Sequence, residues 1–130
     1  MKTLPLCFAA GCFGALINSA VVWICDNFGV LEALQVQIPI TYSAEWMYQR
    51  IVWGGIWGFL FILPVYKSSI FMKGTIISLI PSLYQLFYVY PYQMGADVAG
   101  LNYGVLTPAL VLFFNWTWGI ATALGIRMFR

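Results

Sequence analysis

The sequence predicts an all-α integral membrane protein with four transmembrane helices in an up-down bundle. Of its 130 residues, 62% are hydrophobic and 18% aromatic, whereas Asp, Glu, Lys and Arg together make only 8%. Soluble domains carry about a quarter charged residues, so lipid must surround most of this chain. The apolar residues also gather into four long runs without the alternation of β-barrel strands. We expect residues 1–130 to form a single membrane domain.

The four runs each have the length of a spanning helix. The first covers residues 4–25, after the base Lys2, and its roughly 22 residues exceed the apolar core of a signal peptide. The next three cover residues 46–66, 69–90 and 103–126, and each can cross about 30 Å as a helix. The connection between the second and third runs is so short that these helices must be antiparallel neighbours.

The connection between the first two runs, residues 26–45, is the longest. Its apolar residues recur at helical spacing until a proline ends the pattern: Val30, Leu31, Leu34, Ile38, then Pro39. We therefore expect a short interfacial helix in this first outer loop. A lid over a pocket is the alternative interpretation of the same residues.

Charge placement predicts the orientation, because short cytoplasmic loops hold an excess of Lys and Arg. With both termini inside, five of the six bases fall on the cytoplasmic side: Lys2, Lys67, Lys73, Arg127 and Arg130. Arg50 alone falls outside, together with all four acids: Asp26, Glu32, Glu45 and Asp97. We expect both termini in the cytoplasm, and the compactness of the chain favours a bacterial inner (plasma) membrane.

Small residues spaced four apart occur in every run and are typical of helices that approach closely in lipid. The rows predict helix packing through these glycines: Gly14, Gly54, Gly58, Gly74 and Gly119. The Gly54-xxx-Gly58 pair fits packing within one chain and also fits a dimer interface. The sequence leaves both interpretations open.

Uncharged polar residues lie inside the predicted spans and are candidates for packing contacts or for the lining of a pore: Asn18, Ser82, Gln85 and Asn115. Amide and hydroxyl groups of this kind hydrogen-bond across helices. The chain has no histidine, and none of its four acids falls inside a predicted span. Proton-coupled transport normally uses such a group, so the sequence argues against it.

Arg50 is the most informative single residue. An arginine near the centre of a span costs roughly 3 kcal/mol of insertion energy, so we expect Arg50 towards the outer end of the second span. There it can reach lipid phosphates or pair with Glu45 or Asp26. With Tyr48 and Gln49 it would form an outer-mouth site for an anion or a lipid headgroup.

Function follows only in outline from these residues. The chain lacks a serine with a histidine base, paired carboxylates in one helix, a phosphate-binding glycine loop and a metal-ligand cluster, so we expect no enzyme activity and no cofactor. Six scattered bases do not predict nucleic-acid binding.

The favoured hypothesis is a non-catalytic subunit or self-assembling component of a membrane complex. Its partners would be membrane lipids, other membrane subunits or copies of itself. The alternative is a homo-oligomeric channel or transporter for a small ion or solute. A lipid-handling enzyme acting near Arg50 is a third possibility.

Overall fold

The computed structural model describes residues 3–36, 42–62, 70–93, 101 and 103–129, and this part of the chain is helical, without strands. The all-helical prediction is therefore confirmed. The elements are α1 (Thr3–Asn27), α2 (Val30–Ala33), α3 (Ala44–Gly58), the 3-10 helix η1 (Phe59–Ile62), α4 (Ile70–Tyr84), the π-helix η2 (Gln85–Gln93) and α5 (Thr107–Phe129). Several residues named above lie outside the described residues: Lys2, Ile38, Pro39, Lys67, Asp97 and Arg130.

Within the described residues, two helices are long and apolar enough to cross a membrane, judged by length and composition. They are Leu4–Asn27 within α1 and Thr107–Met128 within α5, and they match the first and fourth predicted runs. The α-helical parts α3 and α4 have 15 residues each, which is short of the roughly 20 residues that a span requires. Only together with η1 and η2 do the helical stretches 44–62 and 70–93 approach or reach that length.

Local sequence explains where α3 begins and where α4 changes its geometry. Ser43 has extended backbone angles, and its hydroxyl accepts the Trp46 amide N–H at 3.2 Å, which caps α3. Pro81 lies inside α4 and removes the hydrogen bond to the Ile77 carbonyl. The helix widens to a π-helix four residues later, at Gln85. Such widening is frequent at functional sites.

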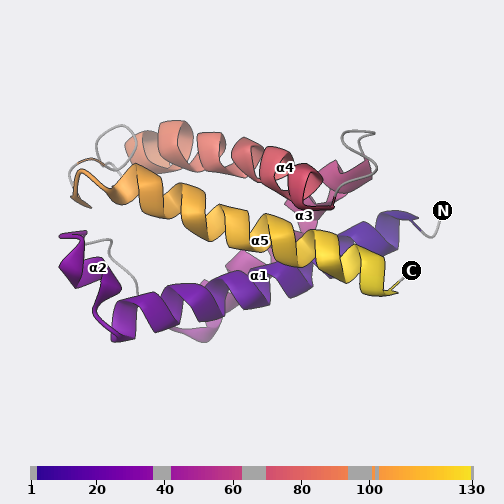
Figure 1. Cartoon of the computed structure of the whole chain (residues 1–130), viewed down its shortest axis with the longest axis horizontal. Coiled ribbons are helices and arrows are strands. Elements are labelled where there is room, and N and C mark those ends of the chain that lie inside the picture. Colours follow the sequence, from indigo (N-terminus) through magenta and orange to yellow (C-terminus); the bar gives the residue numbers. More distant parts are fainter. Residues whose placement is uncertain (1–2, 37–41, 63–69, 94–100, 102, 130) are drawn as a thin grey trace.

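The helices pack side by side in the order α3, α1, α5, α4. Contacts are extensive between α1 and α3, between α1 and α5, and between α4 and α5. By contrast, α4 contacts the helical stretch 44–62 chiefly at η1. Both ends of the chain lie at the same end of the molecule, and α2 lies at the opposite end (Figure 1). The helical stretches 44–62 and 70–93 are thus neighbours near η1 and share few contacts further along the bundle.

The helices approach closely where they carry glycine. A methyl group added at Gly74 would lie 2.8 Å from the carbonyl oxygen of Gly119, and one added at Gly54 would lie 2.6 Å from the Ala15 Cβ. One at Gly14 would press on Trp118 and Thr122, and one at Gly58 on Cys7 and Gly11. All five predicted packing glycines therefore make their contacts inside this chain.

The short helix α2 occupies part of the first long connection. Leu31 is buried against Val22 of α1 and against Leu110 and Phe114 of α5. This apolar contact fixes α2 over one end of the bundle. Nearby, the Tyr42 hydroxyl donates to the Asp26 carboxylate at 2.7 Å, and burial and the Asp26 charge raise the pKa of Tyr42 above its ordinary value.

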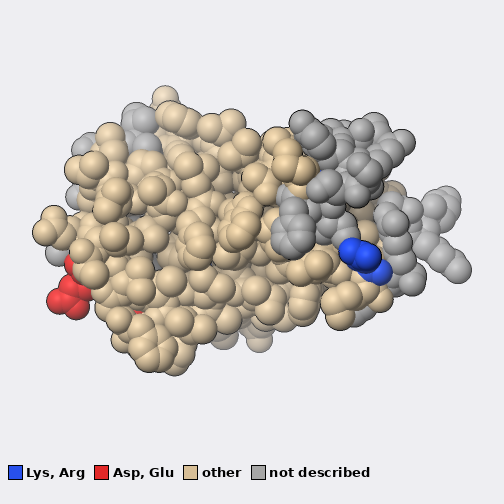
Figure 2. Space-filling view, viewed as in Figure 1, with Lys and Arg blue, Asp and Glu red and all other residues tan. Residues whose placement is uncertain are grey.

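The charged residues are separated along the long axis. Asp26 lies near the end of α1 and Glu32 lies on α2, at the end remote from the termini, whereas Arg127 lies in the last turn of α5. In Figure 2 the acidic atoms project at the α2 end, and the basic atoms lie towards the end that holds the termini. The face between them in this view is almost free of charge.

Candidate functional site

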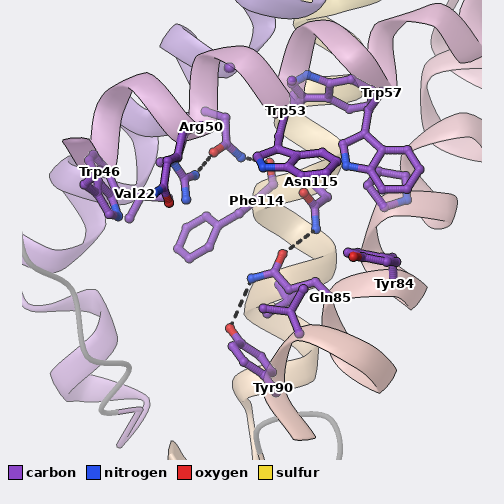
Figure 3. Close-up of a pocket in the computed structure, with 18 residues that line it drawn as sticks. Val22, Trp46, Arg50, Trp53, Trp57, Tyr84, Gln85, Tyr90, Phe114 and Asn115 are labelled. Atoms are coloured by element: carbon purple, nitrogen blue, oxygen red, sulfur yellow. Dashed lines mark hydrogen bonds between the residues drawn. The ribbon is translucent and has the colours of Figure 1, made fainter. Parts of the chain in front are cut away.

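A cavity of about 450 Å³ lies inside the bundle (Figure 3). Its lining comes from α1, α3, α4, η2 and α5 and consists of Ala15, Asn18, Val22, Trp46, Gln49, Arg50, Trp53, Gly54, Trp57, Pro81, Tyr84, Gln85, Val89, Tyr90, Val111, Phe114, Asn115 and Trp118. A volume of this size is in the range of small-molecule binding sites.

The cavity opens sideways between α3 and α4. Its exposed lining residues are Gln49 and Trp53 on α3 and Tyr84 on α4, and the exposed fractions of Trp53 and Tyr84 are 52% and 36%. These two helices share few contacts, whereas α1 and α5 pack tightly and close the floor. The opening therefore faces the side of the bundle.

Arg50 projects from α3 and is held by three groups. Its guanidinium lies over the Trp46 ring, 4.7 Å from the ring centre, and its Nε donates to the Ser19 hydroxyl at 2.9 Å. Its Nη2 donates to the Asn18 side-chain oxygen, and the Asn18 amide donates in turn to the Phe114 carbonyl. Asn18 thus joins the arginine on α3 to the backbone of α5.

In the described part of the chain, Arg50 has N–H groups without an acceptor and no carboxylate partner. A guanidinium has five N–H groups, and only two of them donate to partners in the described part of the chain. Arg50 is also the sole charged residue among those described that line the cavity. The two carboxylates expected as partners lie elsewhere, because Asp26 accepts from Tyr42 and Glu45 is exposed in the first turn of α3.

A second hydrogen-bond network faces Arg50 across the cavity (Figure 3). The Asn115 amide donates to the Gln85 side-chain oxygen at 3.3 Å, and the Gln85 amide donates to the Tyr90 hydroxyl at 3.2 Å. Tyr90 is buried beside Val111 and packs edge-on against Tyr103 at 5.8 Å between ring centres. The π-helix η2 carries both Gln85 and Tyr90, so its geometry positions this network.

The structure joins two groups of residues that the sequence predicts separately. Asn18, Gln85 and Asn115, predicted for packing or a pore, share the cavity with Arg50 and Gln49 from the predicted outer mouth. Two predicted residues do not line it. The Ser82 hydroxyl is fully buried and donates to the Ser78 carbonyl at 2.8 Å, and Tyr48 is 67% exposed on the outside of α3.

Sequence reasoning missed the aromatic wall. Trp46, Trp53 and Trp57 all line the cavity from α3, and Tyr84 faces them from α4, with its ring 5.5 Å from that of Trp57. The sequence did contain a pattern that indicates this arrangement. Residues 46, 50, 53 and 57 are spaced three or four apart and therefore lie on one face of a helix. Ser19, the partner of Arg50, carried no comparable signal.

Comparison with protein-family models, curated proteins and solved structures finds no match to this chain. The function is therefore inferred from the chemistry of the cavity alone.

Proposed function

We propose that this chain crosses a bacterial inner membrane four times and holds an amphipathic molecule in the cavity, as a non-catalytic subunit or self-assembling component of a membrane complex. The four crossings are α1, residues 44–62, residues 70–93 and α5. Their lengths support this proposal, as does the position of both chain ends at one end of the molecule (Figure 1). The charge separation supports cytoplasmic termini, because the described base Arg127 lies at that end.

The sideways opening is the observation that carries the binding function. In a bilayer, an opening between α3 and α4 faces lipid, so the ligand enters from the membrane. Trp53, Trp57 and Tyr84 offer broad apolar surfaces for a hydrocarbon part. Arg50 and the Gln85 network offer hydrogen bonds to a polar part. A ligand with both parts fits this lining better than a bare ion or a pure hydrocarbon.

The same geometry weighs against a channel formed between copies of the chain. Such a channel needs its polar residues on the outside of each bundle, facing a shared path. Asn18, Gln85 and Asn115 instead line a cavity within one bundle. The glycine rows are also occupied by contacts inside the chain, so any complex must form through the bulky exposed faces.

The proposal is tested by measuring bound lipid after purification in mild detergent, with native mass spectrometry on the full chain. We expect one retained amphipathic molecule per chain. Val89 on η2 lines the cavity, so Val89→Trp should place an indole ring inside it and lower retention. Phe87 on the same helix is exposed outside the cavity, and Phe87→Trp is the matched control that should retain the molecule.

Two results would contradict the binding function. One is a wild-type chain that carries no molecule in defined stoichiometry after delipidation and re-addition of lipid extract. The other is equal retention by Val89→Trp and Phe87→Trp, since the cavity would then not be the binding site.

A further inference from the structure

We propose that the polar part of the ligand is a phosphodiester that carries a hydroxylated group, as in the headgroup of phosphatidylglycerol, and that Arg50 binds the phosphate. This inference rests on the proposed function and names the ligand class for the same cavity. Three features of the lining carry it: a cation with no carboxylate partner among the described residues, a group of neutral hydrogen-bonding side chains opposite it, and the distribution of apolar surface towards the opening.

The first feature is the charge of Arg50. Trp46 covers one face of the guanidinium, Ser19 and Asn18 take two of its N–H groups, and no described carboxylate lines the cavity. A cation at membrane depth without a counter-charge is costly, and such residues mark ligand sites or paths. The remaining N–H groups form part of the planar fork that matches phosphate oxygens.

The second feature is the group of neutral hydrogen-bonding side chains that lies across the cavity from Arg50. Asn115, Gln85 and Tyr90 form a neutral chain of hydrogen bonds. Among the described residues, one amide N–H of Gln85, the side-chain oxygen of Asn115 and the Tyr90 hydroxyl proton have no partner in these two bonds. A simple fatty-acid carboxylate would accept hydrogen bonds from Arg50 but would not reach Asn115, Gln85 and Tyr90. A headgroup with hydroxyl groups beyond the phosphate reaches both Arg50 and this group of neutral side chains.

The third feature is the orientation that the lining imposes. The polar groups Arg50, Asn18 and Asn115 lie towards α1 and α5, whereas the opening is bordered by the exposed aromatic residues Trp53 and Tyr84 and by one polar residue, Gln49. The headgroup therefore lies inside and the hydrocarbon chains leave between α3 and α4. Choline and ethanolamine headgroups carry an added positive charge that Arg50 would repel, so the site selects anionic lipids.

The test compares three lipids on the full chain in mild detergent, by native mass spectrometry: phosphatidylglycerol, phosphatidic acid and phosphatidylcholine. We expect phosphatidylglycerol to bind about tenfold more tightly than phosphatidylcholine, the gain typical of hydrogen bonds to a charged group. Phosphatidic acid, which lacks the hydroxylated group, should fall between them. Gln85→Leu should lower phosphatidylglycerol binding to the level of phosphatidic acid.

Arg50→Gln should remove the preference while leaving one lipid of any class bound, because the aromatic wall is intact. Arg127→Gln at the exposed end of α5 is the matched control and should keep the preference. Arg50→Lys keeps the charge without the fork, and we expect about a threefold preference to remain. If neither Arg50 variant folds, the ranking of the three lipids on the wild-type chain decides the proposal.

The outcomes separate this inference from the proposed function. A wild-type chain that binds no lipid overturns both. Lipid binding without headgroup preference, or a preference that survives in Arg50→Gln, overturns only the phosphate assignment. Glycerol 3-phosphate tests whether a water-soluble molecule supplies the phosphate instead of a lipid. If it binds without lipid and this binding depends on Arg50, the ligand is not a lipid. If it fails to displace phosphatidylglycerol at millimolar concentration, the lipid assignment is supported.

Discussion

At the scale of single residues, two buried threonines in α5 have opposite surroundings. The Thr122 hydroxyl donates to the Trp118 carbonyl at 2.7 Å, whereas the Thr107 hydroxyl is buried without a partner among the described residues. A buried hydroxyl stabilises a fold only when its hydrogen bond is made. The two residues therefore contribute differently to stability, although both are fully buried.

Replacing each threonine by valine should reveal this difference. We expect Thr107→Val to leave the unfolding free energy unchanged or to raise it, because it removes an unsatisfied polar group. Thr122→Val should lower it by about 1 kcal/mol through loss of the hydrogen bond. Thermal unfolding in mild detergent measures both. A loss in Thr107→Val as large as that in Thr122→Val would refute this account.

Sequence reasoning identified most of the polar cavity residues but not their partners. Arg50 is conspicuous in the sequence because a cation is rare in a spanning helix, and Asn18, Gln85 and Asn115 are conspicuous because amides are rare there. Which groups meet depends on how far each helix is rotated about its axis. The carboxylates of Glu45 and Asp26 were therefore plausible partners for Arg50, and the structure assigns it Ser19 and Asn18 instead.

At the scale of helices, small residues set how closely neighbours approach. Gly74 of α4 and Gly119 of α5 meet backbone to backbone. Gly125, further along α5, has more room, since a methyl group there would meet the Phe13 ring at 3.3 Å and the Ala10 Cβ at 3.4 Å. The first pair therefore belongs to the α4–α5 contact, whereas Gly125 faces α1.

Gly74→Ala should destabilise the bundle by about 1–3 kcal/mol, because the added methyl group would collide with the Gly119 carbonyl. Gly125→Ala should change the unfolding free energy by less than about 0.5 kcal/mol, since the shortest contact of its added methyl group is 3.3 Å, against 2.8 Å at Gly74. Detergent-solubilised chains compared by thermal unfolding give the result. Equal effects of the two variants would show that backbone contact does not limit the packing.

The helix boundaries were predictable to different degrees. Apolar length alone located α1 and α5, which need no other signal. The change from α4 to the π-helix η2 was not predictable from apolar length, because it depends on where the backbone groups freed near Pro81 find new partners. That change matters for the site, since Gln85 and Tyr90 both lie on η2.

At the scale of the whole molecule, the cavity arises from the order in which the helices pack. The short connection predicted that the second and third stretches are antiparallel neighbours, and they do meet near η1. They separate further along because α1 and α5 pack between them and hold α3 and α4 apart. Periodicity within single helices carries no information on this order, so the sequence did not predict the sideways opening.

The central claim is that the four helical stretches cross a bilayer, because only then does the opening between α3 and α4 face lipid. The most direct measurement is labelling with a membrane-impermeant maleimide on intact spheroplasts of a bacterial host. The three native cysteines are first replaced by alanine. Single cysteines are then introduced at exposed positions, one in each variant: Tyr92→Cys, Val105→Cys and Met128→Cys. We predict labelling of Tyr92→Cys and Val105→Cys from outside, and of Met128→Cys only after permeabilisation. Labelling of Val105→Cys and Met128→Cys from the same side of an intact membrane would contradict the account.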